Sequence, residues 1–264
     1  MPRAAWVEWV PLCLVLALAA WLAGEAVSTA QPEMTPPGSS TDADIVAVQP
    51  AIERPAPIPS GLPVGSEPQS VTAGLSPTAE LVSAEWATSA AAATGIPLRA
   101  LLGYAGAELR LAREKPGCGL GWMTLAALGS IESDHGRNRG SAIDAGGTTV
   151  PGVFGPVLDG TTYAAFRDTD AGKLDGDTGW DRAVGPLQFI PATWAVWGAD
   201  GNADGVADPQ QIDDAALSAG RYLCDTGDLS TASSWRLAIY SYNHVDSYVD
   251  LVAATANSYT ERMP

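Results

Sequence analysis

A single glutamate, Glu132, stands near the end of an apolar segment, where a carboxyl group could carry acid–base chemistry. The segment runs from Leu125 to Ser133, and helical spacing places Glu132 on the same face as Leu125 and Leu128. Burial against apolar neighbours disfavours a charged carboxylate and would raise its pKa to about 6. Such a group is suited to donating a proton near neutral pH, although a glutamate at a helix end is also typical of an exposed surface.

Two segments downstream of Glu132 supply side-chain amides and aromatic rings beside predicted helix ends. The first contains Gly185-Pro186-Leu187-Gln188-Phe189, a Gly-Pro turn that precedes a new helix. The second contains Tyr240-Ser241-Tyr242-Asn243, at the end of another helix. Each segment is weak evidence alone, so their order along the chain carries the functional argument.

In the order Glu132-Ser133, Gly185 to Phe189 and Tyr242-Asn243, these segments resemble the three signatures of lytic transglycosylases. Those are lysozyme-like enzymes that cleave the glycan strands of peptidoglycan. From about Ala84 to its C-terminus, the chain is similar to the B-type membrane-associated lytic murein transglycosylases, which have a long insertion between the glutamate and glutamine motifs. The segments that carry this longer similarity are Asp168-Thr169-Asp170, Leu174-Asp175-Gly176-Asp177, Trp180-Asp181-Arg182, Asp200-Gly201-Asn202-Ala203-Asp204-Gly205 and Ile212-Asp213-Asp214-Ala215-Ala216.

The resemblance implies a mainly α, lysozyme-like fold and a role for each signature residue. Glu132 corresponds to the catalytic acid and base. Gln188 and Phe189 correspond to the cleft wall, and Tyr242 with Asn243 to groups that orient the glutamate and the substrate. The further expected substrate contacts are Ser133, Asp177 and Trp180.

The reaction implied by the resemblance is cleavage of the β-1,4 bond between N-acetylmuramic acid and N-acetylglucosamine, with formation of 1,6-anhydromuramic ends. It requires no cofactor. A lysozyme-type hydrolase is an alternative, and it would need a water held by Asp177 or Asp181. A non-catalytic cell-wall-binding module is a second alternative.

An acidic loop after the insertion has the spacing of a calcium-binding loop. Asp200, Asn202 and Asp204, followed by Gly205, match its first, third, fifth and sixth positions. The twelfth position, a glutamate in calcium loops, is Gln211 here. The sequence therefore leaves two interpretations open: a structural calcium ion, with Asp208 as a nearby ligand, or a solvated loop in which Asp208 caps the next helix.

The two histidines, His135 and His244, have no Cys or acidic partner at a recognisable ligand spacing. A catalytic metal is therefore not predicted. Two cysteines, Cys118 and Cys224, remain once Cys13 is assigned to the apolar N-terminal segment. In an exported chain this even pair predicts a disulfide, with two free buried thiols as the alternative.

Residues 1–30 have the architecture of a signal peptide, with Arg3, an apolar run from Val10 to Ala23 and small residues after it. An uncleaved membrane anchor through residues 4–23 is the alternative. Either interpretation predicts an extracytoplasmic protein that is secreted or held at the outer face of the cytoplasmic membrane, in contact with the cell wall.

The remaining chain divides into a linker and a domain. Residues 31–77 hold half of the twenty prolines without a helical or alternating pattern, which predicts a disordered linker. Residues 78–264 form the predicted catalytic domain, in which residues 137–181 are a long Gly/Asp-rich loop insertion. The predicted helices cover an Ala-rich segment around residues 85–92 and then about 97–114, 122–133, 191–197, 209–224, 234–242 and 245–260.

The charge balance restricts the partners. The chain has 30 Asp and Glu against 14 Lys and Arg, for a formal net charge of −16. Proteins that bind nucleic acid through its phosphates usually have the opposite balance, so nucleic acid is not an expected partner. The expected partner is the peptidoglycan glycan strand, and a monomer is the expected state.

Overall fold

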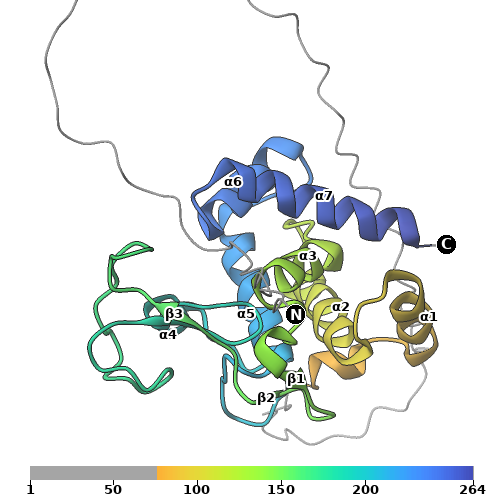
Figure 1. Ribbon diagram of the computed structural model, residues 1–264. Coiled ribbons are helices and arrows are strands. Elements are labelled where there is room, and N and C mark those ends of the chain that lie inside the picture. The colour runs from red at the N-terminus through yellow and green to blue at the C-terminus, as the bar shows by residue number, and fades with distance from the viewer. Residues whose placement is uncertain (1–75, 264) are drawn as a thin grey trace, which may run out of the picture.

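The computed structural model describes residues 76–263, so the predicted signal or anchor and almost all of the predicted linker lie outside the described residues. The described chain is mainly α, as the sequence predicts (Figure 1). Three short 3-10 helices, η1 to η3, and four short strands accompany the α-helices. The α-helices are α1 (Ala84–Thr94), α2 (Leu98–Glu114), α3 (Trp122–Ser133), α4 (Pro191–Trp197), α5 (Ile212–Leu223), α6 (Ala232–Tyr242) and α7 (Asp246–Arg262).

Helix α3 runs through the core of the helical body, between α2, α5 and α7 (Figure 1). Every residue from Trp122 to Gly129 is buried, so this part of the helix has no exposed face. A helix that is apolar all round must be enclosed by other elements. Glu132 therefore stands at the end of a firmly packed element.

A glycine inside α3 permits the close approach of α2. A Cβ atom at Gly129 would overlap the hydroxyl group of Tyr104, whose side chain is fully buried. A glycine in a helix costs about 1 kcal/mol relative to alanine, and here the packing of Tyr104 requires it.

The predicted helix boundaries are confirmed for α3 and α4 and differ by a few residues elsewhere. Helix α5 begins at Ile212 rather than at Pro209, because Gln211 is its N-cap. The Gln211 Oε1 atom accepts hydrogen bonds from the backbone N–H groups of Asp213 (2.5 Å) and Asp214 (3.3 Å). The interpretation that Asp208 caps this helix is therefore wrong.

The insertion contains two small antiparallel sheets that the sequence pattern did not predict. Strands β1 (Ala142–Ile143) and β2 (Thr149–Val150) form one, and β3 (Phe154–Val157) and β4 (Arg182–Val184) form the other. Strands of two to four residues are too short to produce a visible alternation of apolar and polar residues. Strand β4 leads directly into the Gly185-Pro186 turn, so the second sheet supports the glutamine motif.

The predicted disulfide is confirmed. Cys118 and Cys224 are joined; they lie 106 positions apart in sequence, with a Cα–Cα distance of 5.4 Å. The bond connects the turn between α2 and α3 to η3 (Cys224–Thr226), directly after α5. It therefore fixes the end of the core opposite to Glu132.

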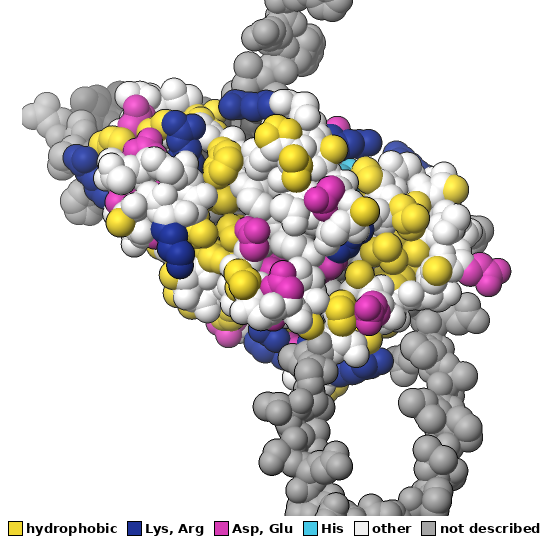
Figure 2. Space-filling model, turned by 90° about the horizontal axis from the view of Figure 1, so that it is seen from below, with side chains coloured by type: hydrophobic (Ala, Val, Ile, Leu, Met, Phe, Trp, Pro, Cys, Tyr) yellow, Lys and Arg dark blue, Asp and Glu magenta, His cyan; other side chains and the backbone are white. Residues whose placement is uncertain are grey.

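None of the helices within residues 76–263 combines the length and the apolar character that crossing a membrane requires. On the face that Figure 2 shows, acidic, basic and hydrophobic side chains are interspersed. The Asp-rich loops therefore do not make this face uniformly acidic.

Candidate functional site

The carboxyl group of Glu132 meets the phenol of Tyr248 at the end of α3. Tyr248, in the first turn of α7, is buried, and its hydroxyl donates a hydrogen bond of 2.5 Å to Glu132 Oε1. Burial raises the pKa of Glu132 to about 7, and the hydrogen bond from Tyr248 opposes this shift by stabilising the carboxylate. The side chain can therefore exist in both protonation states near neutral pH, as a general acid and base requires.

The chain turns sharply directly after Glu132. Asp134 and His135 both have left-handed backbone conformations, with φ of 53° and 56°, and Gly136 follows with φ of 76°. Each non-glycine residue in this region costs about 1–2 kcal/mol. Hydrogen bonds from the Asp134 N–H to Ser130 O (3.0 Å) and from the His135 N–H to Gly129 O (2.8 Å) hold the turn. The strain is thus located within three residues of the candidate acid.

Ser133 connects this turn to the glutamine motif. Its buried hydroxyl donates to the Pro186 carbonyl oxygen at 2.6 Å and accepts from the Gly136 N–H at 2.7 Å. Because Ser133 follows Glu132 directly, the bond to Pro186 places the glutamine turn beside the candidate acid. Ser133 is therefore a positioning residue in this structure.

The glutamine turn is compact and holds Gln188 in an unusual conformation. Backbone hydrogen bonds in both directions join Val184 and Phe189, and Gln188 has a left-handed φ of 51°. The Gln188 side-chain amide donates to Gly185 O at 2.8 Å. A Cβ atom at Gly155 in β3 would lie 2.9 Å from Gln188 Oε1, so the glycine leaves room for this side chain.

Tyr242 supports the glutamine turn from α6. Its hydroxyl donates to the Leu187 carbonyl oxygen at 2.6 Å. Burial is the first cause that raises the pKa of Tyr242, and the charge of nearby Glu132 is the second. Tyr242 thus lies near Glu132, but the hydrogen bond to the carboxyl group comes from Tyr248, which the sequence analysis did not single out.

Of the two remaining signature residues, Phe189 lies in the core and Asn243 lies at the end of α6. The Phe189 ring is buried and packs edge-on against Trp194 (5.1 Å between ring centroids) and Tyr242 (6.1 Å). It therefore supports the turn from inside the core. Asn243 is half-buried and ends α6 as its C-cap.

The structure places Asp177 and Trp180 in the insertion. Asp177 accepts hydrogen bonds from the backbone N–H groups of Gly179 (2.9 Å) and Trp180 (3.2 Å), and these bonds lower its pKa. The Arg167 guanidinium carbon lies 3.8 Å from the centroid of the Trp180 ring. One face of that ring is therefore already covered. In Figure 1 the insertion extends to one side of the helical body.

Asp181, the other aspartate that a hydrolytic mechanism could use, is fully buried. Its two oxygens accept hydrogen bonds from the Thr169 N–H (2.9 Å) and the Thr169 hydroxyl (2.7 Å). One oxygen atom each from Asp168, Asp170 and Asp181 lies within 4.8 Å of the others. Asp168 and Asp170 also accept hydrogen bonds from backbone N–H groups of their own loop. These three aspartates therefore hold the backbone of the insertion in place.

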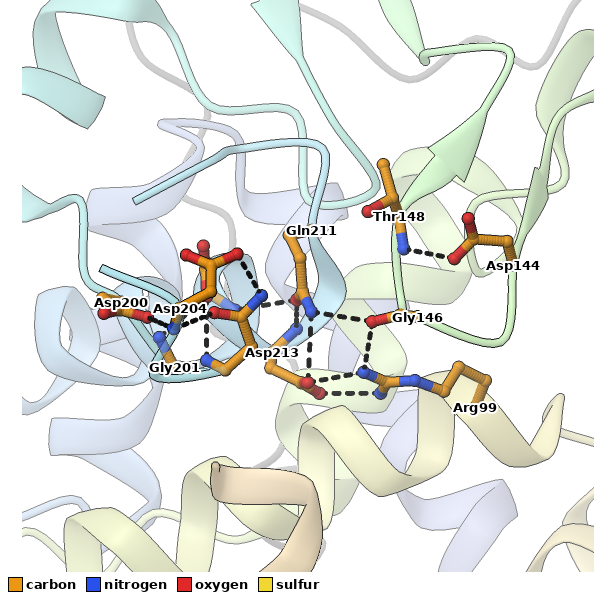
Figure 3. Close-up of polar contacts among 11 residues, drawn as sticks. Arg99, Asp144, Gly146, Thr148, Asp200, Gly201, Asp204, Gln211 and Asp213 are labelled. Atoms are coloured by element: carbon orange, nitrogen blue, oxygen red, sulfur yellow. Dashed lines mark hydrogen bonds and ion pairs between the residues drawn. The ribbon is translucent and has the colours of Figure 1, made fainter. Parts of the chain in front are cut away.

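The predicted calcium loop is a tight acidic turn. Asp200 accepts hydrogen bonds from the N–H groups of Asp204 (3.2 Å) and Gly205 (2.9 Å) (Figure 3). Asn202 Oδ1 accepts from the Asp204 N–H at 3.0 Å, and Asp204 Oδ1 accepts from the Val206 N–H at 2.8 Å. The three side chains therefore gather on one turn, with the carboxylate and amide oxygens that calcium prefers.

Asp214 supplies a further carboxylate to this loop. It is fully buried and accepts hydrogen bonds from the N–H groups of Gly201 (2.7 Å), Asn202 (3.1 Å) and Asp208 (2.9 Å). Burial raises its pKa to about 6, and these three N–H donors lower it. Its position, 14 residues after Asp200, explains why the twelve-residue calcium pattern did not identify it.

Beside the loop, an ion pair joins α2 to α5, and hydrogen bonds from Arg99 and Gln211 attach the β1–β2 turn to these helices (Figure 3). The Arg99 guanidinium donates to both carboxylate oxygens of Asp213, at 2.7 and 2.5 Å, and to Gly146 O at 3.1 Å. The Gln211 side-chain amide also donates to Gly146 O at 3.1 Å. Asp213 is therefore bound to Arg99. Gln211 uses its side-chain oxygen to cap α5 and its side-chain amide to bind the β1–β2 turn.

Glu132, Ser133, Gln188 and Tyr242 are thus brought together, whereas Asp177 and Trp180 belong to the insertion. Comparisons of the chain with models of protein families, with curated proteins and with solved structures found no match. The candidate site is therefore defined by its own geometry: a half-buried acid, a phenol bound to it, and the turn that carries Gln188, which Ser133 joins to the end of α3.

Proposed function

We propose that this chain is a lytic transglycosylase with a lysozyme-like domain, which cleaves peptidoglycan between N-acetylmuramic acid and N-acetylglucosamine. The observation that carries the proposal is the state of Glu132. Its pKa of about 7 and its hydrogen bond from Tyr248 suit a group that must first donate and later accept a proton.

The proposed reaction uses Glu132 twice. The protonated carboxyl group donates its proton to the glycosidic oxygen, and the bond from that oxygen to C1 of the muramic acid breaks. The carboxylate then removes the proton from the 6-hydroxyl of the same sugar, whose oxygen forms a bond to C1. Charge at C1 is stabilised in between by the 2-acetamido carbonyl of the sugar. A 1,6-anhydro ring results, and no water is consumed.

Tyr248 and the glutamine turn have separate parts in this proposal. The Tyr248 hydroxyl stabilises the carboxylate that forms after the first proton transfer, because it donates to Oε1. The proposal assigns Gln188, whose side-chain amide donates to Gly185 O within its own turn, to the cleft wall beside the bond to be cut. Ser133 and Tyr242 keep this turn against the end of α3.

The contacts of the insertion aspartates favour the lyase over a hydrolase. A hydrolase needs a second carboxylate to activate water. Asp181 is fully buried with both oxygens bound to Thr169, and Asp177 is bound to the backbone of its own loop. Asp181 is therefore closed to water, and Asp177 is engaged by its own loop.

The proposed setting is outside the cytoplasmic membrane, on the glycan strands of the cell wall. The Cys118–Cys224 disulfide supports this, since such bonds persist in oxidising compartments. The proposal keeps residues 1–30 as signal or anchor and assigns a structural calcium ion to the Asp200–Asp208 loop. The support for that ion is that Asp200 and Asn202 both accept from the Asp204 N–H on one turn.

Digestion of purified peptidoglycan tests the proposal. The wild-type chain is expected to release fragments with 1,6-anhydromuramic ends, identified by mass spectrometry, and Glu132→Gln is expected to bind the polymer without cutting it. Muramic ends that borohydride reduces would show that the chain is a hydrolase and not a lyase. A wild-type chain that binds and never cuts would instead indicate a wall-binding module.

A further inference from the structure

We propose that His135 is a positioning residue, which acts with Tyr104 and Tyr259 to hold the end of α3 so that Glu132 stays against Tyr248. The inference rests on the proposed function and deepens it. His135 contacts the turn and the two tyrosines rather than the substrate, so its effect on Glu132 passes through the backbone.

The imidazole of His135 is enclosed between two phenols. Its Nδ1 lies 3.2 Å from the Tyr104 hydroxyl on α2, and its Nε2 lies 3.1 Å from the Tyr259 hydroxyl on α7. All three side chains are buried. A neutral imidazole has one donor and one acceptor nitrogen, so one phenol accepts from the ring and the other donates to it. The arrangement satisfies both ring nitrogens.

The surroundings keep this ring neutral. Burial and, to a smaller extent, the positive charge of Arg137 lower the pKa of His135 to about 4, and the charge of Asp134 opposes both effects. The groups that face the ring from the packed elements are Tyr104 of α2 and Tyr259 of α7. The charge state of His135 is therefore constant over the range in which Glu132 titrates.

The packing around His135 is built for this contact. Gly129 of α3 lacks a side chain where the Tyr104 hydroxyl lies, which lets that hydroxyl reach the ring. The left-handed conformations of Asp134 and His135 bring the ring back under the helix end. Strained backbone of this kind persists only where the surrounding contacts hold it.

Helix α7 binds both the end of α3 and the turn that follows it. Within α7, Tyr248 donates to Glu132, and Tyr259, eleven residues later, bonds with His135. A shift of the α3 end relative to α7 would break both contacts together. Loss of the His135 contact would thus free the turn and admit water to Glu132. Because burial outweighs the Tyr248 bond in setting the pKa of Glu132, loss of both moves this pKa down toward that of a solvated carboxyl group.

The experiment compares three variants of the full chain with the wild type: His135→Leu, Tyr259→Phe and His135→Gln. Tyr259→Phe removes only the hydroxyl, and His135→Gln keeps one donor and one acceptor. The pKa of Glu132 is read by NMR titration of carboxyl-labelled glutamate, with Glu132→Gln to assign the signal. The pH of half-maximal peptidoglycan cleavage on the alkaline side is the second readout.

His135→Leu and Tyr259→Phe are each expected to lower both values by at least one pH unit, and His135→Gln by less. Leu111→Ala, a buried change where α2 meets Gly220 of α5, is the matched control that lowers the melting temperature alone. Unchanged titration in folded Tyr259→Phe would overturn the inference, even if His135→Leu fails to fold. The NMR value needs no activity, so an inactive wild-type chain would contradict only the proposed function.

Discussion

Tyr248 donates its hydroxyl hydrogen to Glu132 across 116 positions of sequence, and this bond joins the first turn of α7 to the last turn of α3. Two effects act in opposite directions on the protonation of Glu132. Burial favours the neutral carboxyl group, whereas the phenol favours the carboxylate, and their balance leaves the pKa of Glu132 at about 7. Changing either contribution should therefore move the pH dependence of the site in a known direction.

The first prediction concerns Tyr248→Phe. Removal of the hydroxyl takes away the donor that stabilises the carboxylate, so the pKa of Glu132 should rise above 7. The alkaline limb of the pH–activity profile should move upward, while the maximal rate falls by about tenfold to a hundredfold because the carboxylate formed in the reaction is less stabilised. Profiles of peptidoglycan cleavage measure both effects.

Tyr240→Phe is the matched control, since Tyr240 is exposed on α6 and stacks edge-on with His244. It should leave the profile in place. A Tyr248→Phe profile with an unmoved or lowered alkaline limb would contradict the assigned role of the phenol.

The second prediction concerns stability against pH. Because the pKa of Glu132 is raised in the folded chain, this group favours folding fully below about pH 4.5, and the contribution is lost as the pH rises through 7. Glu132→Gln should therefore be more stable than the wild type at pH 8, by roughly 1–3 kcal/mol, and equally stable at pH 4. Denaturant unfolding at the two pH values measures the difference.

Glu85→Gln, a change at an exposed position on α1, is the control for the second prediction. It should alter the free energy of unfolding by less than about 0.5 kcal/mol at either pH. Equal stability of Glu132→Gln and the wild type at pH 8 would mean that the carboxylate of Glu132 is well hydrated.

The third prediction concerns the disulfide. Reduction, or replacement of Cys118 and Cys224 by serine, should lower the free energy of unfolding by about 2–5 kcal/mol, because the unfolded chain loses a long closed loop. The bond lies at the far end of α3 from Glu132, so the folded double variant should keep the pH profile of cleavage. A changed profile at temperatures well below unfolding would contradict this separation.

The fourth prediction concerns calcium. If the Asp200–Asp208 loop holds an ion, saturating calcium should raise the melting temperature of the full chain and a chelator should reverse the shift. Asp200→Asn with Asp204→Asn should abolish the shift. Loss of the shift on the same changes at Asp168 and Asp170 would instead place the ion in the insertion, whose three gathered carboxylates could also hold one. A wild-type melting temperature that does not respond to calcium would remove the ion from the proposal.

How much the sequence could predict depends on the range of each interaction. The α3 and α4 boundaries follow from local spacing and were predicted. The disulfide was predicted too, because Cys118 and Cys224 are the two cysteines outside the apolar N-terminal segment and allow one pairing. The Glu132–Tyr248 bond was not predicted, since it depends on how α7 crosses α3. Tyr248 does share a buried helical face with Val249 and Val252, and that pattern is the signal that could have drawn attention to it.

The strained positions were also beyond local patterns. The residue types of Gln188 and His135 do not indicate a left-handed backbone. It accompanies turns that short-range backbone hydrogen bonds close, and Ser133 and Tyr242 bind the Gln188 turn from distant parts of the chain. Asp214 was also missed as the central carboxylate of its loop. It lies three residues beyond the last position of a twelve-residue calcium pattern, and its role depends on bonds to Gly201 and Asp208.

The last prediction tests the contact between Gly129 and Tyr104. Gly129→Ala places a methyl group where the Tyr104 hydroxyl lies, so one of the two helices must shift or Tyr104 must leave the ring of His135. Such overpacking should cost about 2–3 kcal/mol of unfolding free energy, although alanine is the better helix former. Tyr104→Phe alone removes one hydrogen bond and should cost about 1–2 kcal/mol. Combined with Gly129→Ala it should cost less than the sum of the two, because the deleted hydroxyl relieves part of the overlap. Additive costs in denaturant unfolding would mean that the two groups do not meet.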